Sequence, residues 1–190
     1  MGSFGELPDD HAPVLTPAEV AVYDQMMAES GPGGDHARGV DLYRQLDWDR
    51  VRAAITVPHD AGEWADGLRQ VLRRVPDPCA RNIWVGPGWY RIVVRLDQAL
   101  AAIDADYEVR QVKEKFAALR FYYATAVDAD RKREMDKLVA RAEGESIRTC
   151  ENTGAPGILM VRGGSWYKTL DPATAPAGYT PAPTGSIFGR

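Results

Sequence analysis

Residues 108–123, with the sequence EVRQVKEKFAALRFYY, hold the densest mixture of aromatic, β-branched and basic side chains in the chain. Apolar and polar residues alternate from Tyr107 to Val112 and again from Leu119 to Tyr123, which predicts two strands with one polar face each. The segment between them, Lys113 to Ala118, contains neither Asn-Gly nor any glycine, so we expect a looser connection than a two-residue hairpin. We interpret this stretch as the structural hub of the fold, two strands that hold the flanking helices together.

An amphipathic helix is predicted on each side of these strands. Upstream, after the turn Gly86-Pro87-Gly88, apolar side chains keep helical spacing at Trp89, Ile92, Val93, Leu96, Leu100 and Ile103. Downstream, Asp128 or Asp130 is suited to cap a helix whose apolar stripe is Met135, Leu138, Val139 and Ala142. Residues 86–148 are therefore predicted to form an α-β-β-α unit.

The preceding residues are predicted to form a helical region, residues 16–80, after a flexible leader at residues 1–15. Thr16 and Glu19 fit a capping box, and Pro17 between them suits the first helical position. Glycine and proline then separate three further helices, which we expect at about residues 40–46, 47–55 and 62–75.

The composition changes after Thr149. Residues 158–161 and 166–170, joined by Arg-Gly-Gly-Ser, predict a small second β-hairpin. Residues 171–190 are rich in Pro, Ala, Thr and Gly, which is typical of an extended or disordered tail. The fold class predicted for the whole chain is α+β, with the N-terminal helical region followed by an α+β core at residues 81–170.

Charge is distributed unevenly along the chain. Residues 1–109 hold 10 Lys and Arg against 18 Asp and Glu, whereas residues 110–148 hold 10 against 7. The acidic first half argues against a nucleic-acid binder that uses its whole surface, while the middle segment leaves room for a local basic patch.

Neither a membrane nor an oxidising compartment is indicated. No apolar run approaches the ~18 residues that cross a bilayer, and the first residues lack the basic and hydrophobic regions of a secretory signal. We therefore expect a cytoplasmic protein in which Cys79 and Cys150 are buried thiols rather than a disulfide. The sequence leaves the oligomeric state open.

Several blocks of sequence, in a fixed order, resemble a known family. They are residues 86–90 (GPGWY), 111–122 (QVKEKFAALRFY), Ala142-Glu143 with Ser146, 149–157 (TCENTGAPG) and 166–171 (WYKTLD). Together they resemble a family of small proteins from phages, prophages and other bacterial mobile elements, in which a VKEKFGGLRFY hairpin precedes a zinc-ribbon-like TCExCGxPG knuckle. The resemblance covers residues 86–171 and implies a protein that acts in the cytoplasm of a bacterial host.

The resemblance also implies that the knuckle is degenerate in this chain. Cys150 remains, but Thr153 and Asp171 occupy the positions where the family has further cysteines. A structural zinc site needs about four Cys or His ligands, so we expect the knuckle to persist as a packed loop with no metal and no cofactor. Ala117 and Ala118 replace the family's central glycines, which implies a turn that does not require positive φ, or adopts it differently.

No assembled catalytic set is recognisable. His11, His36 and His59 each stand beside an aspartate, but all three fall in predicted loops or termini, and adjacent side chains usually point apart, so we interpret them as solvated residues. The glycine-rich turns lack a P-loop lysine, and Cys150 has no neighbouring histidine. The sequence thus favours a protein that is not an enzyme, and a pocket joining two His-Asp pairs would reverse that interpretation.

The leading functional hypothesis is a non-catalytic protein of a phage or mobile element that binds a protein partner, such as a host or defence protein. Its candidate contact residues are Lys113, Lys115, Arg120, Tyr122 and, in the tail, Phe188. The alternative is a nucleic-acid-binding protein that uses the basic segment 110–148, with aromatic rings stacking on bases. That alternative predicts salt-sensitive binding that is lost when Lys113 and Lys115 are replaced.

Overall fold

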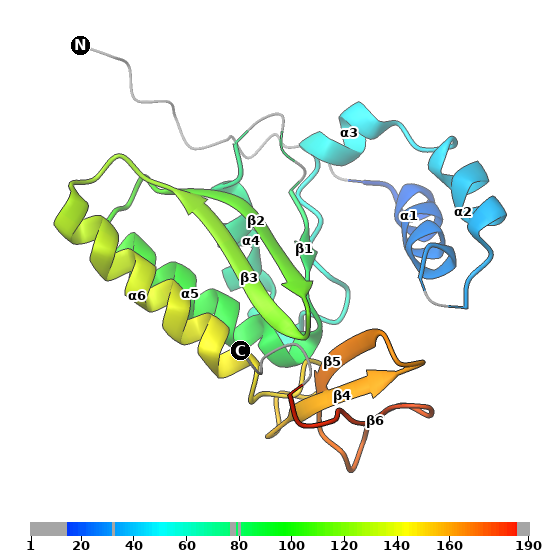
Figure 1. The fold of residues 1–190 in the computed structure, drawn as a ribbon. Coiled ribbons are helices and arrows are strands. Elements are labelled where there is room, and N and C mark those ends of the chain that lie inside the picture. Colours follow the sequence, from blue (N-terminus) through cyan, green and yellow to red (C-terminus); the bar gives the residue numbers. More distant parts are fainter. Residues whose placement is uncertain (1–14, 32, 77–78, 80, 186–190) are drawn as a thin grey trace. The chain divides into compact units, whose positions relative to one another are not determined.

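The protein has an α+β fold in the computed structural model, which describes residues 15–31, 33–76, 79 and 81–185 (Figure 1). The chain divides into two compact units. The first comprises residues 1–56 and 77–81, and the second comprises residues 57–76 and 82–190. None of the helices in the described ranges is long and apolar enough to cross a lipid bilayer.

Three helices build the first unit: α1 (Pro17–Glu29), α2 (His36–Tyr43) and α3 (Trp48–Ala53). The predicted capping box is confirmed, because the Thr16 N–H donates to Glu19 Oε2 at 2.6 Å and the Glu19 N–H donates to Thr16 Oγ1 at 3.3 Å. Helix α2 begins four residues before the expected start at Val40, because the Asp35 carboxylate accepts the N–H groups of Ala37 and Arg38.

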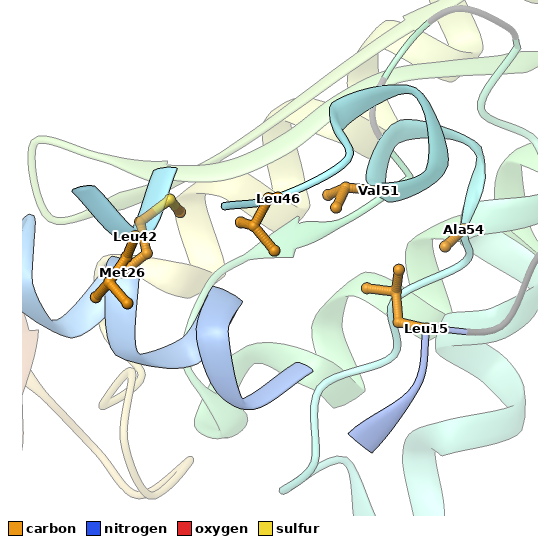
Figure 2. Packing of buried hydrophobic residues seen from close by; sticks show 6 residues of the cluster. All are labelled: Leu15, Met26, Leu42, Leu46, Val51 and Ala54. Carbon is orange, nitrogen blue, oxygen red and sulfur yellow. The ribbon is translucent and has the colours of Figure 1, made fainter. Parts of the chain in front are cut away.

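A small apolar cluster holds the first unit together (Figure 2). It consists of the buried residues Leu15, Met26, Leu42, Leu46, Val51 and Ala54. At its edge the rings of Tyr43 and Trp48 stack with centroids 4.4 Å apart, and the Trp48 indole donates to the Tyr43 carbonyl at 2.9 Å. An ion pair at 2.8 Å between Arg50 and Glu19 joins α3 to the start of α1.

The second unit contains a three-stranded sheet with helices against one of its faces (Figure 1). Its strands are β1 (Ile83–Trp84), β2 (Glu108–Lys115) and β3 (Ala118–Ala124), in the order β1-β2-β3, with β1 parallel and β3 antiparallel to β2. Its helical segments are η1 (Gly62–Trp64), α4 (Ala65–Arg73), η2 (Pro87–Trp89), α5 (Tyr90–Ala101) and α6 (Ala129–Ser146). Helix α5 packs between α4 and α6, and α6 also contacts β3. The predicted α-β-β-α order is confirmed, and the sequence interpretation missed β1 because it is only two residues long.

The connection between β2 and β3 differs from the prediction of a loose turn. Lys115 pairs with Ala118, so only Phe116 and Ala117 form the turn. Both residues have positive φ, 54° and 60°, as a two-residue hairpin turn of this type requires. The expectation failed because neither residue is a glycine, asparagine or aspartate, the types that usually signal such a turn.

Strand β2 also carries a bulge that the alternation of its residues concealed. The register shifts between Val109, which pairs with Tyr123, and Gln111, which pairs with Tyr122. The extra residue, Arg110, lets both Val109 and Val112 face the core although they are three positions apart.

Helix α6 covers the free edge of β3. The Ser146 hydroxyl accepts the Leu119 N–H at 2.9 Å, and the Glu143 carboxylate accepts the Phe121 N–H at 3.3 Å. An uncovered edge strand presents unpaired backbone groups that invite pairing with other chains. The helix therefore satisfies two outward N–H groups of β3 with its own side chains.

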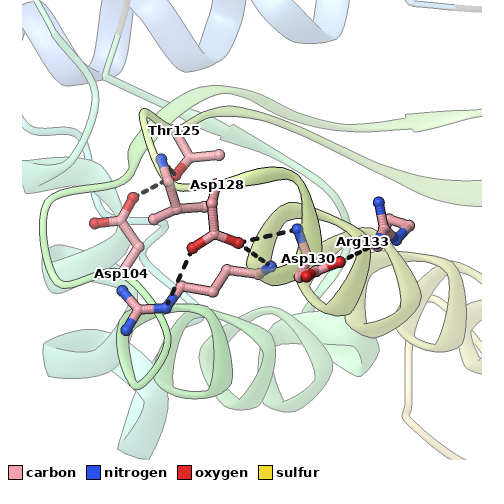
Figure 3. A network of polar contacts seen from close by, with 7 residues as sticks. Asp104, Thr125, Asp128, Asp130 and Arg133 are labelled. Atoms are coloured by element: carbon pink, nitrogen blue, oxygen red, sulfur yellow. Dashed lines mark hydrogen bonds and ion pairs between the residues drawn. The ribbon is translucent and has the colours of Figure 1, made fainter.

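The start of α6 is fixed by a polar network (Figure 3). Asp128, one of the two predicted caps, accepts the N–H groups of Asp130 and Arg131, both at 3.0 Å. The Arg131 N–H is the main reason why the pKa of Asp128 lies below its usual range. In the same network the Thr125 hydroxyl donates to Asp104, and Asp130 forms an ion pair with Arg133.

A second small sheet follows α6, with the order β5-β4-β6. The predicted hairpin is confirmed as β4 (Ile158–Arg162) and β5 (Trp166–Leu170). The described part of the tail does more than extend from the fold, because β6 (Thr180–Pro181) pairs with β4 and Tyr179 packs on the cluster of Cys150, Met160 and Leu170.

Candidate binding surface

Strand register in the β1-β2-β3 sheet sorts its side chains onto two faces. Ile83, Val112 and Phe121 lie opposite one another and are all buried. The neighbouring positions point the other way, since side chains alternate along a strand. They are Trp84, Gln111, Lys113, Arg120 and Tyr122, and we define these five residues as the open sheet face.

Two large aromatic rings on the open sheet face are exposed. Trp84 on β1 keeps 46% and Tyr122 on β3 keeps 44% of its surface in contact with solvent. Lys113 lies on the strand between them, with its Nζ 5.8 Å from the centre of the Tyr122 ring. An exposed Trp and an exposed Tyr on one sheet face are a composition that favours binding, since Trp and Tyr contribute strongly to protein interfaces.

Arg120 has a different role from the one predicted for it. Its guanidinium forms an ion pair with Glu143 of α6 at 3.1 Å and donates to the Leu119 carbonyl at 3.2 Å. The side chain is half-buried and ties the edge of β3 to α6. Arg120 therefore supports the open sheet face and is less available to a partner than Lys113.

The hairpin tip next to the open sheet face is anchored by hydrogen bonds although it ends in an exposed ring. Ala117 is fully buried, its N–H donates to Glu114 Oε1 at 2.6 Å, and its carbonyl accepts from Thr169 Oγ1 at 2.7 Å. Phe116 is 55% exposed, and Lys115 Nζ lies 5.3 Å from its ring centre. Positive φ is unfavourable for such a residue, so these hydrogen bonds hold Phe116 in a strained position that faces solvent.

Glu114 lies beneath this tip, close to a second carboxylate. Burial raises the pKa of Glu114 above its usual range, and the charge of Glu151 adds to the rise. The hydrogen bond from Ala117 and the charges of Lys168 and Arg120 oppose the rise without cancelling it.

Half of the cations in the predicted basic segment are neutralised by the protein's own carboxylates. Five of the ten cations in residues 110–148 form ion pairs: Arg110 with Glu108, Arg120 with Glu143, Arg131 with Asp128, Lys132 with Asp136 and Arg133 with Asp130. Lys113 and Lys115 have ring contacts but no ion pair with the described residues. The cationic character of the open sheet face and of the adjacent hairpin tip thus rests on two lysines, Lys113 on the face and Lys115 at the tip.

The knuckle at residues 149–157 packs against the Gly86–Gly88 turn. The Gly88 N–H donates to the Glu151 carbonyl at 2.7 Å, and the Gly86 N–H donates to the Glu151 carboxylate at 3.1 Å. Glu151 is buried and also pairs with Lys168 at 2.6 Å. A Cβ at Gly88 would lie 2.1 Å from the Cys150 carbonyl oxygen, so the two loops can approach this closely only with glycine there.

The Cys150 thiol is surrounded by hydrogen-bond donors from nearby residues. Burial works to raise the pKa of its thiol, but hydrogen bonds from the Thr153 hydroxyl and from the N–H groups of Asp171, Thr153 and Asn152 lower it overall. The described residues contain no cluster of three or more His, Cys, Asp or Glu side chains that could hold a metal ion. Cys79 is also a free thiol, though only half-buried.

The aspartates of the His-Asp pairs have structural partners. Asp35 caps α2, and Asp60 accepts the Tyr90 hydroxyl at 2.7 Å. His11 and the predicted contact residue Phe188 lie outside the described residues.

Comparison of the chain with protein-family models, with curated proteins and with solved structures finds no match. The candidate surface therefore rests on its own geometry. Of the residues predicted as contacts, the sheet brings Lys113, Arg120 and Tyr122 onto one face, and Lys115 lies at the tip. Sequence reasoning missed Trp84, because a two-residue strand leaves almost no local signal.

Proposed function

We propose that this protein is a non-catalytic binding protein that contacts a protein partner through the open sheet face and the Lys115-Phe116 tip. The observation that carries the proposal is the exposure of Trp84, Tyr122 and Phe116 on a unit whose other face is well packed. Burying an exposed aromatic side chain on association is worth about 1.5–3 kcal/mol, and a rigid surface loses little conformational freedom on binding.

The resemblance of residues 86–171 to proteins of phages and mobile elements supports a partner in a bacterial host, such as a host or defence protein. The resemblance supports a proposal about where the protein acts, whereas the open sheet face supports a proposal about how it binds.

Nucleic-acid binding is the second candidate, favoured by the position of Lys113 between two exposed aromatic rings. It is less well supported than protein binding, because half of the cations in the basic segment are already paired and the whole chain carries a net charge of −4. Affinity for a phosphate backbone depends on the number of cations free to replace its counterions.

The test compares affinity capture from host cells by three tagged full-length proteins: the wild type, the double variant Trp84→Ala/Tyr122→Ala, and Trp166→Ala. Trp166 on β5 is 44% exposed and lies outside the open sheet face, so it is a matched control. We expect the wild type and Trp166→Ala to retain the same partner and the double variant to lose it. Equal recovery by all three proteins would contradict the proposal.

The nucleic-acid candidate is tested in parallel with a fluorescent oligo(dT) and an oligo(U) at low salt. Flat titrations are expected for the wild type. Binding that weakens steeply with salt and disappears in Lys113→Ala/Lys115→Ala would establish the second candidate instead.

A further inference from the structure

A groove lies between α5 and α6, in a part of the second unit that the proposed function does not use. Its volume is about 330 Å³, within the range of roughly 300–1,000 Å³ in which proteins bind small molecules. It is lined by Ile92, Arg95, Leu96, Ala99, Leu138, Arg141, Ala142 and Glu145.

The groove exists because small side chains occupy the helix seam. Ala99 on α5 and Ala142 on α6 both line it, where longer side chains would fill the space between the helices. The remaining apolar lining comes from Ile92, Leu96 and Leu138. The lining spans residues 92–99 and 138–145, about 10 Å of each helix at 1.5 Å per residue.

The charges of the groove favour an anion. Arg95 of α5 and Glu145 of α6 form an ion pair across the seam, so the single carboxylate of the lining is already neutralised. Arg141 is exposed and has no ion pair with any described residue. The lining therefore combines an apolar floor with one uncompensated cation, and a ligand with the complementary chemistry has an apolar body and one negative group.

The same ion pair decides between a small ligand and a partner helix. A helix lying along the seam would have to displace the Arg95–Glu145 bridge, whereas a short molecule fits beside it. We propose that the groove binds a small amphipathic anion, a medium-chain carboxylate or an aromatic sulfonate, with its negative group at Arg141 and its apolar body against Leu96, Ala99 and Leu138. This binding site is separate from the open sheet face and does not depend on the proposed function.

The experiment uses the purified full-length protein and two probes, 8-anilinonaphthalene-1-sulfonate followed by fluorescence and decanoate as its competitor. We expect saturable binding of the sulfonate that decanoate displaces. Ala99→Leu should fill the groove and abolish binding while leaving the thermal unfolding curve in place, because leucine is a good helix former. Arg141→Ala should weaken binding about tenfold, the loss of one charge-assisted contact.

Lys137→Ala is the matched control, because Lys137 is an exposed cation on α6 that does not line the groove. It should bind both probes like the wild type. Binding that survives in Ala99→Leu would place the probe elsewhere and overturn the proposal. Flat titrations with both probes would also overturn the proposal. Loss of a captured protein from Ala99→Leu would overturn it in favour of a macromolecular occupant.

Discussion

Phe116 combines an unfavourable backbone conformation with an exposed side chain. Its backbone lies in the left-handed region, with a φ of 54°, and its ring is more than half exposed. Packing of the ring therefore offsets little of the backbone strain. Residues held in an unfavourable backbone conformation are often found at functional surfaces.

We expect Phe116→Gly to raise the free energy of unfolding by about 0.5–1 kcal/mol, because positive φ costs an L-residue roughly 1–2 kcal/mol and the greater chain entropy of glycine offsets part of the gain. Chemical denaturation measures the change. Ala118→Gly, two positions further along the chain and without positive φ, is the control and should lower stability by about 1 kcal/mol. Destabilisation by Phe116→Gly would show that the ring contributes packing or that the turn is unstrained.

Glu114 is expected to make stability depend on pH in the direction opposite to most carboxylates. Its pKa is raised in the folded protein, so the folded state binds the proton more tightly than the unfolded chain. The contribution of Glu114 to the free energy of unfolding should therefore increase as the pH falls from above the folded pKa toward the usual value of 4.5.

Glu114→Gln tests this pH dependence, because glutamine keeps an acceptor for the Ala117 N–H and carries no charge. We expect the variant to be more stable than the wild type at pH 7, with the difference shrinking as pH falls toward 4. Thermal unfolding over that range measures it, with the exposed Glu134 as the control position for the same substitution. A constant difference across the range would exclude Glu114 as the titrating group.

At the scale of elements, the second unit depends on how α6 completes β3. The Ser146 hydroxyl is buried, accepts the Leu119 N–H and donates to the Glu143 carbonyl at 2.7 Å. Helix and strand thus share a polar contact inside the protein, where an unpaired N–H would be costly.

Ser146→Ala should lower the free energy of unfolding by about 1–3 kcal/mol, because the Leu119 N–H would be left buried without a partner. Gly144→Ala on the same helix is the control. Apart from its chain neighbours and the nearby backbone of its own helix, no atom lies within 4 Å of a Cβ built there, so the substitution should raise stability by about 0.5–1 kcal/mol. Urea denaturation of both variants measures the two shifts, and an unchanged Ser146→Ala would mean that water replaces the hydroxyl.

At the scale of the whole molecule, the knuckle is expected to be held by packing rather than by metal. The Gly86–Gly88 turn, the buried Glu151 and its ion pair with Lys168 supply contacts that hold the loop in place. The sequence predicted a packed loop without naming its contacts, and the structure identifies them.

We expect the melting temperature to be unchanged by EDTA, and elemental analysis of the purified protein to find no stoichiometric zinc. A structural zinc ion contributes folding free energy directly, so its removal would lower the melting temperature markedly. One zinc per chain, with loss of stability in EDTA, would contradict this account of Cys150.

Sequence reasoning located the elements whose causes are local. The Thr16 and Asp128 caps, the apolar stripe of α5 and the β4–β5 hairpin were predicted because hydrogen bonds and periodic burial within a few residues determine them. The short strand β1 was missed, because a two-residue element has no periodicity. The start of α2 was predicted four residues too late, because the Asp35 cap was not recognised.

The hub at residues 108–123 shows where the sequence by itself is sufficient and where it is not. The alternation of apolar and polar residues was sufficient to predict that two strands form there. Only the tertiary structure decided the tight turn, because Glu114 and the distant Thr169 hold Ala117 in a conformation that its residue type disfavours. It also decided the binding surface, since Trp84 reaches Lys113 through a parallel pairing of segments 29 positions apart. Contacts between distant residues fix both features, and no local pattern encodes them.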